Sequence, residues 1–177
     1  GYDPYGVKCI YVAAPALGSA NATADGKIKF VWDRADKAES YNVYRKASGE
    51  SSWSKLANVK TTEYIDAAVE KNKVYTYTVR SVIGTNRSSY NKNGVSCGII
   101  DAPVLNDIER TQDGYAKITW SGIEGASYKI YRKYGAGGWA HINTTTSTEY
   151  IDKSNLSNGM EYYYTVKACL GSVNGGY

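Results

Sequence analysis

Two stretches of the chain alternate strictly between apolar and polar positions, Val74–Val82 (VYTYTVRSV) and Glu161–Cys169 (EYYYTVKAC). Alternation with a period of two predicts a β-strand with one buried and one exposed face. Such a strand needs partner strands and a second sheet over its apolar face, so each stretch predicts a β-sandwich around it. The residues expected to face the two cores are Tyr75, Tyr77 and Val79 in the first stretch and Tyr162, Tyr164 and Val166 in the second.

The two stretches belong to an internal repeat with a period of 86–88 residues. TEYID, for example, occurs unchanged at 62–66 and at 148–152. Residues kept in both copies of one chain are expected to belong to the fold, because both copies need a fold and need not share a site. Other matched segments are 25–32 and 113–120, 40–46 and 127–133, and 75–79 and 162–166.

Turn signals every 8–15 residues separate short alternating runs, which predicts an all-β chain of two immunoglobulin-like sandwiches. We expect seven strands in copy one and a similar series in copy two from Val104 onward. The join Asp101-Ala102-Pro103 has no Gly-Ser spacer and predicts a short, stiff connection. The strands expected in copy one are 16–22, 27–34, 41–46, 55–59, 63–67, 74–83 and 94–100.

Composition supports this fold class and reduces the number of function classes to consider. Tyr occurs 18 times in 177 residues, and Ala-Leu-Glu helical runs are absent. The net charge of +4 is dispersed without a basic block, which argues against nucleic acid as a partner. No apolar run approaches the roughly 18 residues of a membrane span, so membrane insertion is not expected. The residues expected to be buried are Trp32, Tyr41, Val43, Tyr64, Tyr75, Tyr77 and Val79 in copy one, and Trp120, Tyr128, Ile130, Tyr150, Tyr162, Tyr164 and Val166 in copy two.

The three cysteines are expected to be free thiols. Their odd number and wide spacing argue against a disulfide framework or a zinc site. The alternation places Cys97 and Cys9 on core faces and Cys169 on the outward face of its strand.

The segments SYNVYRK, TEYID and VYTYTVRSV resemble fibronectin type III modules, particularly the tandem modules in secreted and surface proteins of Gram-positive, often gut-dwelling, anaerobic bacteria. The resemblance covers nearly the whole chain. It implies that Tyr75 and Tyr162 are tyrosine-corner residues, whose hydroxyls bond backbone a few residues upstream. Modules of this kind serve as spacers, adhesion units and ligand-binding units, so the resemblance implies a fold more strongly than a function.

A catalytic constellation is not visible in the sequence. The single histidine, His141, falls on a predicted edge strand where copy one has Lys55. Asp66 and Asp152 end strands, where an aspartate usually caps a turn through neighbouring backbone groups. We therefore expect no enzyme activity, cofactor or metal site.

Exposed aromatic residues suggest carbohydrate binding, because flat rings stack on sugar faces. In a purely structural alternative, Trp53 and Trp139 lie at the sandwich edge and pack on the aliphatic stems of Arg45 and Arg132. A second alternative is a protein-binding face formed by Tyr131, Tyr163, Lys129 and Lys167. The candidate ligand contacts are Trp139, Tyr134, Tyr163, Tyr131 and Trp53.

The first residues of the chain resemble the last strand of copy one, a strand that copy two lacks. Tyr2–Pro15 aligns residue for residue with Tyr90–Pro103, the last strand of copy one, and Tyr177 stands where Tyr90 stands. The expected division is therefore 1–14 as a last strand belonging to another module, 15–101 as copy one, and 102–177 as copy two without its own last strand. Either the chain was cut from a longer array, or one chain donates this strand to the next. The residues of the donation interface would be Val7, Cys9, Tyr11, Tyr162, Tyr164 and Val166.

Together these features predict a non-catalytic structural or adhesive segment of an extracellular bacterial protein. Its partners would be other modules of the same protein or neighbouring copies. The alternatives are a pair of carbohydrate-binding modules, for cell-wall or dietary polysaccharide, and a segment that binds a host protein.

Overall fold

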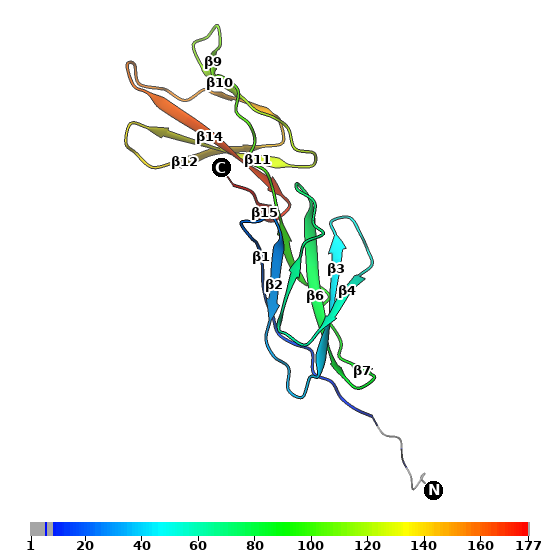
Figure 1. The fold of residues 1–177 in the computed structure, drawn as a ribbon. Helices are drawn as coiled ribbons and strands as arrows, with labels where there is room; N and C mark the ends of the chain where they lie inside the picture. Colours follow the sequence, from blue (N-terminus) through cyan, green and yellow to red (C-terminus); the bar gives the residue numbers. More distant parts are fainter. Residues whose placement is uncertain (1–5, 7–8, 177) are drawn as a thin grey trace. The chain divides into compact units, whose positions relative to one another are not determined.

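The computed structural model describes Gly6 and residues 9–176, which form strands and turns without a helix (Figure 1). The chain divides into two compact units. The first holds the chain up to Val69 together with Tyr75–Cys97, and the second holds Glu70–Val74 and Gly98 onward. Each unit contains one copy of the predicted all-β sandwich.

Copy one has two facing sheets. One follows the order β1-β2-β5, and the other follows β4-β3-β6-β7 with β8 also paired to β6. Its seven predicted strands are confirmed to within two residues at every end, and only the two-residue β7 was not predicted. The strands are β1 (Leu17–Ala22), β2 (Ile28–Trp32), β3 (Ser40–Ala47), β4 (Ser54–Val59), β5 (Glu63–Asp66), β6 (Val74–Ile83), β7 (Asn86–Arg87) and β8 (Val95–Gly98).

Copy two builds the same pair of sheets, β13-β10-β9 and β12-β11-β14-β15. Its first strand is reduced to the short β9 and an isolated bridge between Leu105 and Trp120. The strands are β9 (Glu109–Arg110), β10 (Ala116–Thr119), β11 (Ser127–Tyr134), β12 (Ala140–Thr145), β13 (Glu149–Asp152), β14 (Tyr162–Leu170) and β15 (Val173–Asn174).

The core of copy one is aromatic. The Phe30 ring centroid lies 5.2 Å from that of Trp32 and 5.6 Å from that of Tyr77, and Trp32 meets Tyr41 edge-on at 5.6 Å. Packing of this kind adds to the burial of large apolar surfaces. Of the seven predicted core residues, six are buried, whereas Tyr64 is half-buried because its strand, β5, lies at the edge of the three-stranded sheet.

The core of copy two has a similar buried centre, but several residues around it are less buried than in copy one. Trp120, Tyr128, Ile130 and Val166 are buried as predicted, and Ile100 packs with them. Three predicted core residues are only half-buried, namely Tyr150, Tyr162 and Tyr164. Tyr150 lies on the edge strand β13. The tyrosines of β14 are half-buried because, among the described residues, no strand covers the edge of Tyr162–Val166 that faces away from β11.

The three cysteines are free, as predicted, but two lie in different surroundings from those expected. Cys97 is buried, in agreement with the alternation. Cys169 is buried rather than exposed, because β15 folds back over it and its Sγ donates to Asn174 Oδ1 at 3.1 Å. Cys9 is exposed rather than in a core, because no described residues pack over that face of its segment.

Candidate functional site

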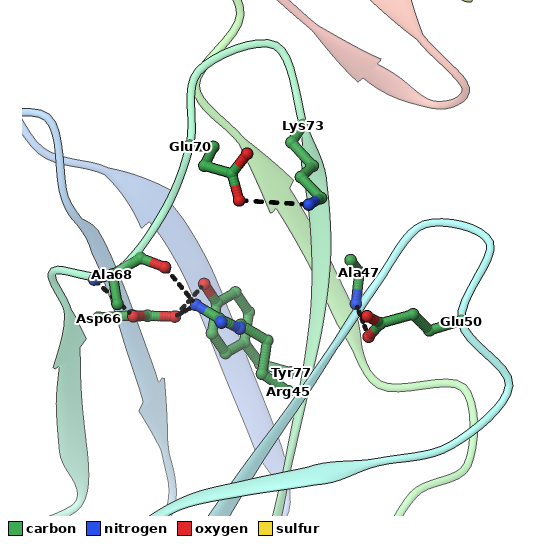
Figure 2. A network of polar contacts seen from close by, with 8 residues as sticks. All are labelled: Arg45, Ala47, Glu50, Asp66, Ala68, Glu70, Lys73 and Tyr77. Atoms are coloured by element: carbon green, nitrogen blue, oxygen red, sulfur yellow. Dashed lines mark hydrogen bonds and ion pairs between the residues drawn. The ribbon is translucent and has the colours of Figure 1, made fainter.

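A buried polar anchor joins the two sheets of copy one. Arg45 of β3 donates to Asp66 Oδ2 at 2.7 Å and to the Ala68 carbonyl at 2.7 Å. The Tyr77 hydroxyl of β6 donates to the same Asp66 oxygen at 2.9 Å. Figure 2 shows these side chains converging from separate strands on the carboxylate, whose exposed fraction is 2%.

Copy two forms the same anchor with its matched residues. Arg132 of β11 donates to Asp152 Oδ2 at 2.7 Å, and the Tyr164 hydroxyl donates to that oxygen at 2.8 Å. Arg132 also bonds the Ser154 hydroxyl. The anchor therefore belongs to the repeated fold and not to one copy.

Burial and neighbouring charges shift the pKa values of several groups in these anchors. Burial opposes the charge of Arg45, but the bond to Asp66 outweighs it and raises the guanidinium pKa. Burial, reinforced by Asp66, raises the pKa of the Tyr77 hydroxyl well above its usual value. Burial works against the Asp152 carboxylate, yet the bonds from Ser154, Tyr164 and Arg132 together lower its pKa.

The predicted turn caps at Asp66 and Asp152 are confirmed, with a second role added. Asp66 Oδ1 accepts from the Ala68 N–H at 3.0 Å, and Asp152 Oδ1 accepts from the Ser154 N–H at 3.0 Å. The other carboxylate oxygen holds the arginine and the tyrosine, which the sequence analysis missed. Each carboxylate is buried and both of its oxygens already accept hydrogen bonds from the protein, as is typical of a structural group.

Tyrosine hydroxyls also hold loops. The predicted corner bond is confirmed for Tyr162, whose hydroxyl accepts from the Ser157 N–H at 3.0 Å. For the buried Tyr75 the corner bond stays a prediction. Two further hydroxyls, not predicted, hold the loop after the second strand: Tyr41 accepts from the Ala35 N–H at 3.1 Å, and Tyr128 from the Ile123 N–H at 2.6 Å.

An exposed aromatic group lies on the four-stranded sheet of copy two. Trp139 is 43% exposed and Tyr163 is 46% exposed. Lys133 Nζ lies between them, 5.0 Å from the Trp139 ring and 5.2 Å from the Tyr163 ring. Tyr134 is exposed too, but its ring lies 6.2 Å from that of Tyr162, on the opposite face of β14 from Tyr163. The structure thus brings together two of the five candidate ligand contacts, Trp139 and Tyr163.

The matched group in copy one is covered by the chain itself. Trp53 is half-buried, with Lys46 Nζ 5.0 Å from its ring and the Tyr90 ring 6.0 Å away. Tyr90 also stacks on Tyr44 at 6.3 Å. Trp53 therefore does not present an open surface.

The expected packing of the two tryptophans on arginine stems is wrong. Trp53 and Trp139 pack with Lys46 and Lys133, one position farther along the strand. The arginines face the opposite way, into the sandwich. There they lie over other rings, Arg45 over Tyr75 at 4.6 Å and Arg132 over Tyr162 at 5.5 Å.

Tyr131 and His141 lie farther along the same sheet. Tyr131 pairs with Thr165 across the sheet, as Tyr44 does with Thr78, and its ring lies 5.3 Å from His141. His141 is exposed on β12, an edge strand as predicted. In the predicted protein-binding face, Lys129 donates to Asn174 at 3.1 Å and is half-buried.

The residues of the predicted donation interface fall into three groups. Cys9 and Tyr11 are exposed, and Tyr11 is 86% exposed. Tyr162 and Tyr164 are half-buried and Val166 is buried. Val7, like Tyr177, lies outside the described residues.

Within the described part of the chain, no cluster of three or more His, Cys, Asp or Glu side chains could hold a metal ion. No helix there has the length and apolar character needed to cross a bilayer.

Comparison with known proteins supports the fold. A two-module fibronectin type III segment of chicken tenascin superposes with a TM-score of 0.50 at 16% identity, covering 93% of this chain and 95% of that one. The chain has the fibronectin type III fold. A fibronectin type III-like protein from Clostridium thermocellum is 27% identical over 55% of this chain and 100% of its own, with a TM-score of 0.42.

In sequence, the chain is similar to a poly(3-hydroxybutyrate) depolymerase from Ralstonia pickettii. The two are 26% identical over 161 residues, which is 89% of this chain. This chain spans only 29% of that depolymerase. No family model matches the chain.

Proposed function

We propose that the chain is a non-catalytic structural and adhesive segment of a secreted or surface-attached bacterial protein, in which two sandwich modules position neighbouring domains. The observation that carries this proposal is the distribution of the repeated residues. Many of the residues kept in both copies lie in the cores and in the Arg-Asp-Tyr anchors, whereas the exposed His141 of copy two is Lys55 in copy one. Selection of this kind preserves a scaffold and not a shared reaction centre.

The similarity to part of a depolymerase supports a place within a larger protein that acts on a polymer. In such a protein the catalytic work falls to another domain. The test is to incubate the purified chain with poly(3-hydroxybutyrate) granules and with soluble esters. We expect no released product. Product release that disappears in His141→Ala would contradict the proposal.

A second candidate function is carbohydrate binding by copy two, favoured by the exposed pair Trp139 and Tyr163. Two rings on one sheet face, with the Lys133 ammonium between them, could stack on a sugar and bond its hydroxyls. Sedimentation with insoluble polysaccharides tests this. Trp139→Ala should abolish binding, whereas the matched control Trp53→Ala should keep it, because Trp53 is covered by Tyr90.

A further inference from the structure

The turn Glu70–Val74 leads into β6 of copy one but groups with the second compact unit, together with Gly98 and the residues after it. An ion pair between Glu70 and Lys73, 3.2 Å apart, spans this turn (Figure 2). Residues 98–101, here called the linker segment, lead from the end of β8 toward copy two. The turn is therefore attached to the connection between the modules as well as to β6.

Asn72, in the middle of this turn, has a backbone conformation that usually requires glycine. Its φ is +58°, and among the described residues Lys37 is the only other non-glycine residue with a positive φ. The matched residue of copy two is Gly159, with a φ of +78°. Asparagine tolerates this conformation because its short polar side chain can bond nearby groups. An asparagine where the repeat has a glycine therefore indicates that the side chain is used.

Three hydrogen bonds join Asn72 to the linker segment. Its backbone N–H donates to the Ile99 carbonyl at 2.7 Å. Its Oδ1 accepts from the Asp101 N–H at 2.8 Å, and its Nδ2 donates to Asp101 Oδ2 at 3.1 Å. One residue therefore satisfies the backbone groups on both sides of Ile100, as a neighbouring strand would.

Lys71 and Gly98 bring the turn and the linker segment closer together. Lys71 Nζ donates to Asp101 Oδ1 at 2.9 Å, so both oxygens of this carboxylate are bonded. The bond from Lys71 lowers the pKa of Asp101 and so favours the charged carboxylate. Lys71 also forms a parallel bridge with Ile99. A Cβ added at Gly98 would lie 2.8 Å from the Lys73 carbonyl oxygen, so the close approach depends on glycine.

The side chain of Ile100 is fixed as well. It is buried and packs in the core of copy two with Ile118 and Trp120. The linker segment thus has its backbone bonded to Asn72 and its central side chain held in a core. Few torsions are left free in a segment that is held in both ways.

We propose that Asn72 is a positioning residue, which fixes the linker segment on the turn through Asp101 and so stiffens the connection between the modules. The proposal names the groups that provide the stiffness expected for this short join. Its use in positioning neighbouring domains rests on the proposed function, whereas the contact itself does not. Measurements on the linker segment therefore test the contact alone, and a negative result there would leave the proposed function standing.

The first experiment measures amide hydrogen exchange and NMR relaxation of the linker segment in the whole chain. In the parent chain the Asp101 amide should be protected, and Ile99–Asp101 should be as rigid as β8. Asn72→Gly removes the side chain and keeps the backbone conformation, as Gly159 does in copy two. Exchange of the Asp101 amide should become about fivefold faster or more. The matched control Lys37→Gly, at the other positive φ, should leave this amide unchanged.

A reversed bond separates the contact from a general loss of stability. Asn72→Asp places a second carboxylate against Asp101 and should speed exchange of the Asp101 amide at least as much as Asn72→Gly does. Adding Asp101→Asn should return exchange to within about threefold of the parent value, because the new amide donates to the new carboxylate. Exchange along β6 serves as the reference for global stability and should change little in any of these variants.

The effect on the modules is measured separately. Relaxation of core amides gives a rotational correlation time for each sandwich. The two times should agree in the parent chain and separate in Asn72→Gly.

Three results would overturn the proposal. The first is an Asp101 amide that exchanges in the parent chain as fast as an unbonded loop amide. The second is an equal acceleration of the Asp101 and β6 amides in Asn72→Gly, which would indicate a loss of global stability. The third is a pair of correlation times that responds no differently to Asn72→Gly than to Lys37→Gly.

Discussion

The strands β6 and β14 have nearly the same sequence pattern but differ in burial. Tyr75 and Tyr77 of β6 are 2% and 0% exposed, whereas their counterparts Tyr162 and Tyr164 are half-buried. The facing sheet keeps the same strand order in both copies, although its first strand is the six-residue β1 in copy one and the two-residue β9 in copy two. β6 has β8 along its edge, and the matching stretch of β14 has no such neighbour among the described residues. The burial of a core-facing side chain in a sandwich therefore depends on the strand beside it as well as on the opposite sheet.

Elsewhere the two copies agree closely. Trp32 and Trp120 are each 4% exposed, and both anchors have an Arg–Asp distance of 2.7 Å. The buried tryptophans and the anchors are thus equivalent in the two copies. Matched variants in the two copies can separate interactions that both modules require from those present only in copy one, where β8 pairs with β6.

The largest expected effects are equal in the two copies. Trp32→Ala and Trp120→Ala should each lower the free energy of unfolding of their own module by about 3–5 kcal/mol, because each removes a buried aromatic ring. Urea denaturation followed by NMR signals from each module measures the two values. A cost below about 1 kcal/mol in either copy would contradict the equivalence of the two cores.

Loss of an anchor arginine should come next. Arg45→Met and Arg132→Met each leave a buried aspartate without its cation. The expected cost is about 2–4 kcal/mol, below the full range for buried pairs because the arginines keep some contact with water. Lys46→Met, one residue away on the outward face, serves as the control and should change stability by less than about 0.5 kcal/mol. Equal effects of Arg45→Met and Lys46→Met would show that the anchor contributes nothing.

The anchor tyrosines should distinguish the copies. Tyr77→Phe removes a donor to a buried carboxylate and should cost about 1–3 kcal/mol. Tyr164→Phe should cost less, about 1 kcal/mol, because the half-buried site of copy two lets water replace the hydroxyl. Module-specific urea midpoints give both values. A larger cost for Tyr164→Phe than for Tyr77→Phe would contradict the role assigned to edge coverage.

The smallest effect is a dependence on pH in copy two. The folded protein lowers the pKa of Asp152 below its ordinary 3.8, so the carboxylate stabilises the fold above that pH. This contribution is lost as the pH falls from the unfolded pKa through the lower folded one. Asp152→Asn should remove this part of the acid sensitivity, measured as urea midpoints at successive pH values below about 5. An unchanged acid slope in the variant would contradict the assignment.

Much of the fold could be predicted from the alternating pattern and the repeat. The alternation indicates where the strands are and which side chains face the core, and the repeat indicates two similar modules. The anchor could also have been found this way. Alternation places Arg45 on the same face as Tyr41 and Val43, and Asp66 on the same face as Tyr64. A charged residue on each of two facing inner surfaces predicts an ion pair. The error of packing Trp53 on Arg45 came from ignoring this facing.

The positions of Cys9 and Cys169 could not be predicted from their own strands. The alternation assigns a face correctly for Cys169, yet the hairpin that ends in β15 folds back over that face and buries the thiol. For Cys9, the pattern of a core residue is present, but burial would require a neighbouring strand. Which face a side chain occupies is a local property, whereas its burial depends on residues distant in the sequence.

Amide hydrogen exchange along β6 and β14 tests the central claim, that the two copies differ in what lies beside these strands. Exchange at Tyr75–Val79 should be slow at every protein concentration, because β8 pairs with that edge. Amides of Tyr162–Val166 that point away from β11 should exchange faster than those of Tyr75–Val79, because no strand of the described chain pairs with that edge. Equally slow exchange along both stretches would contradict the account.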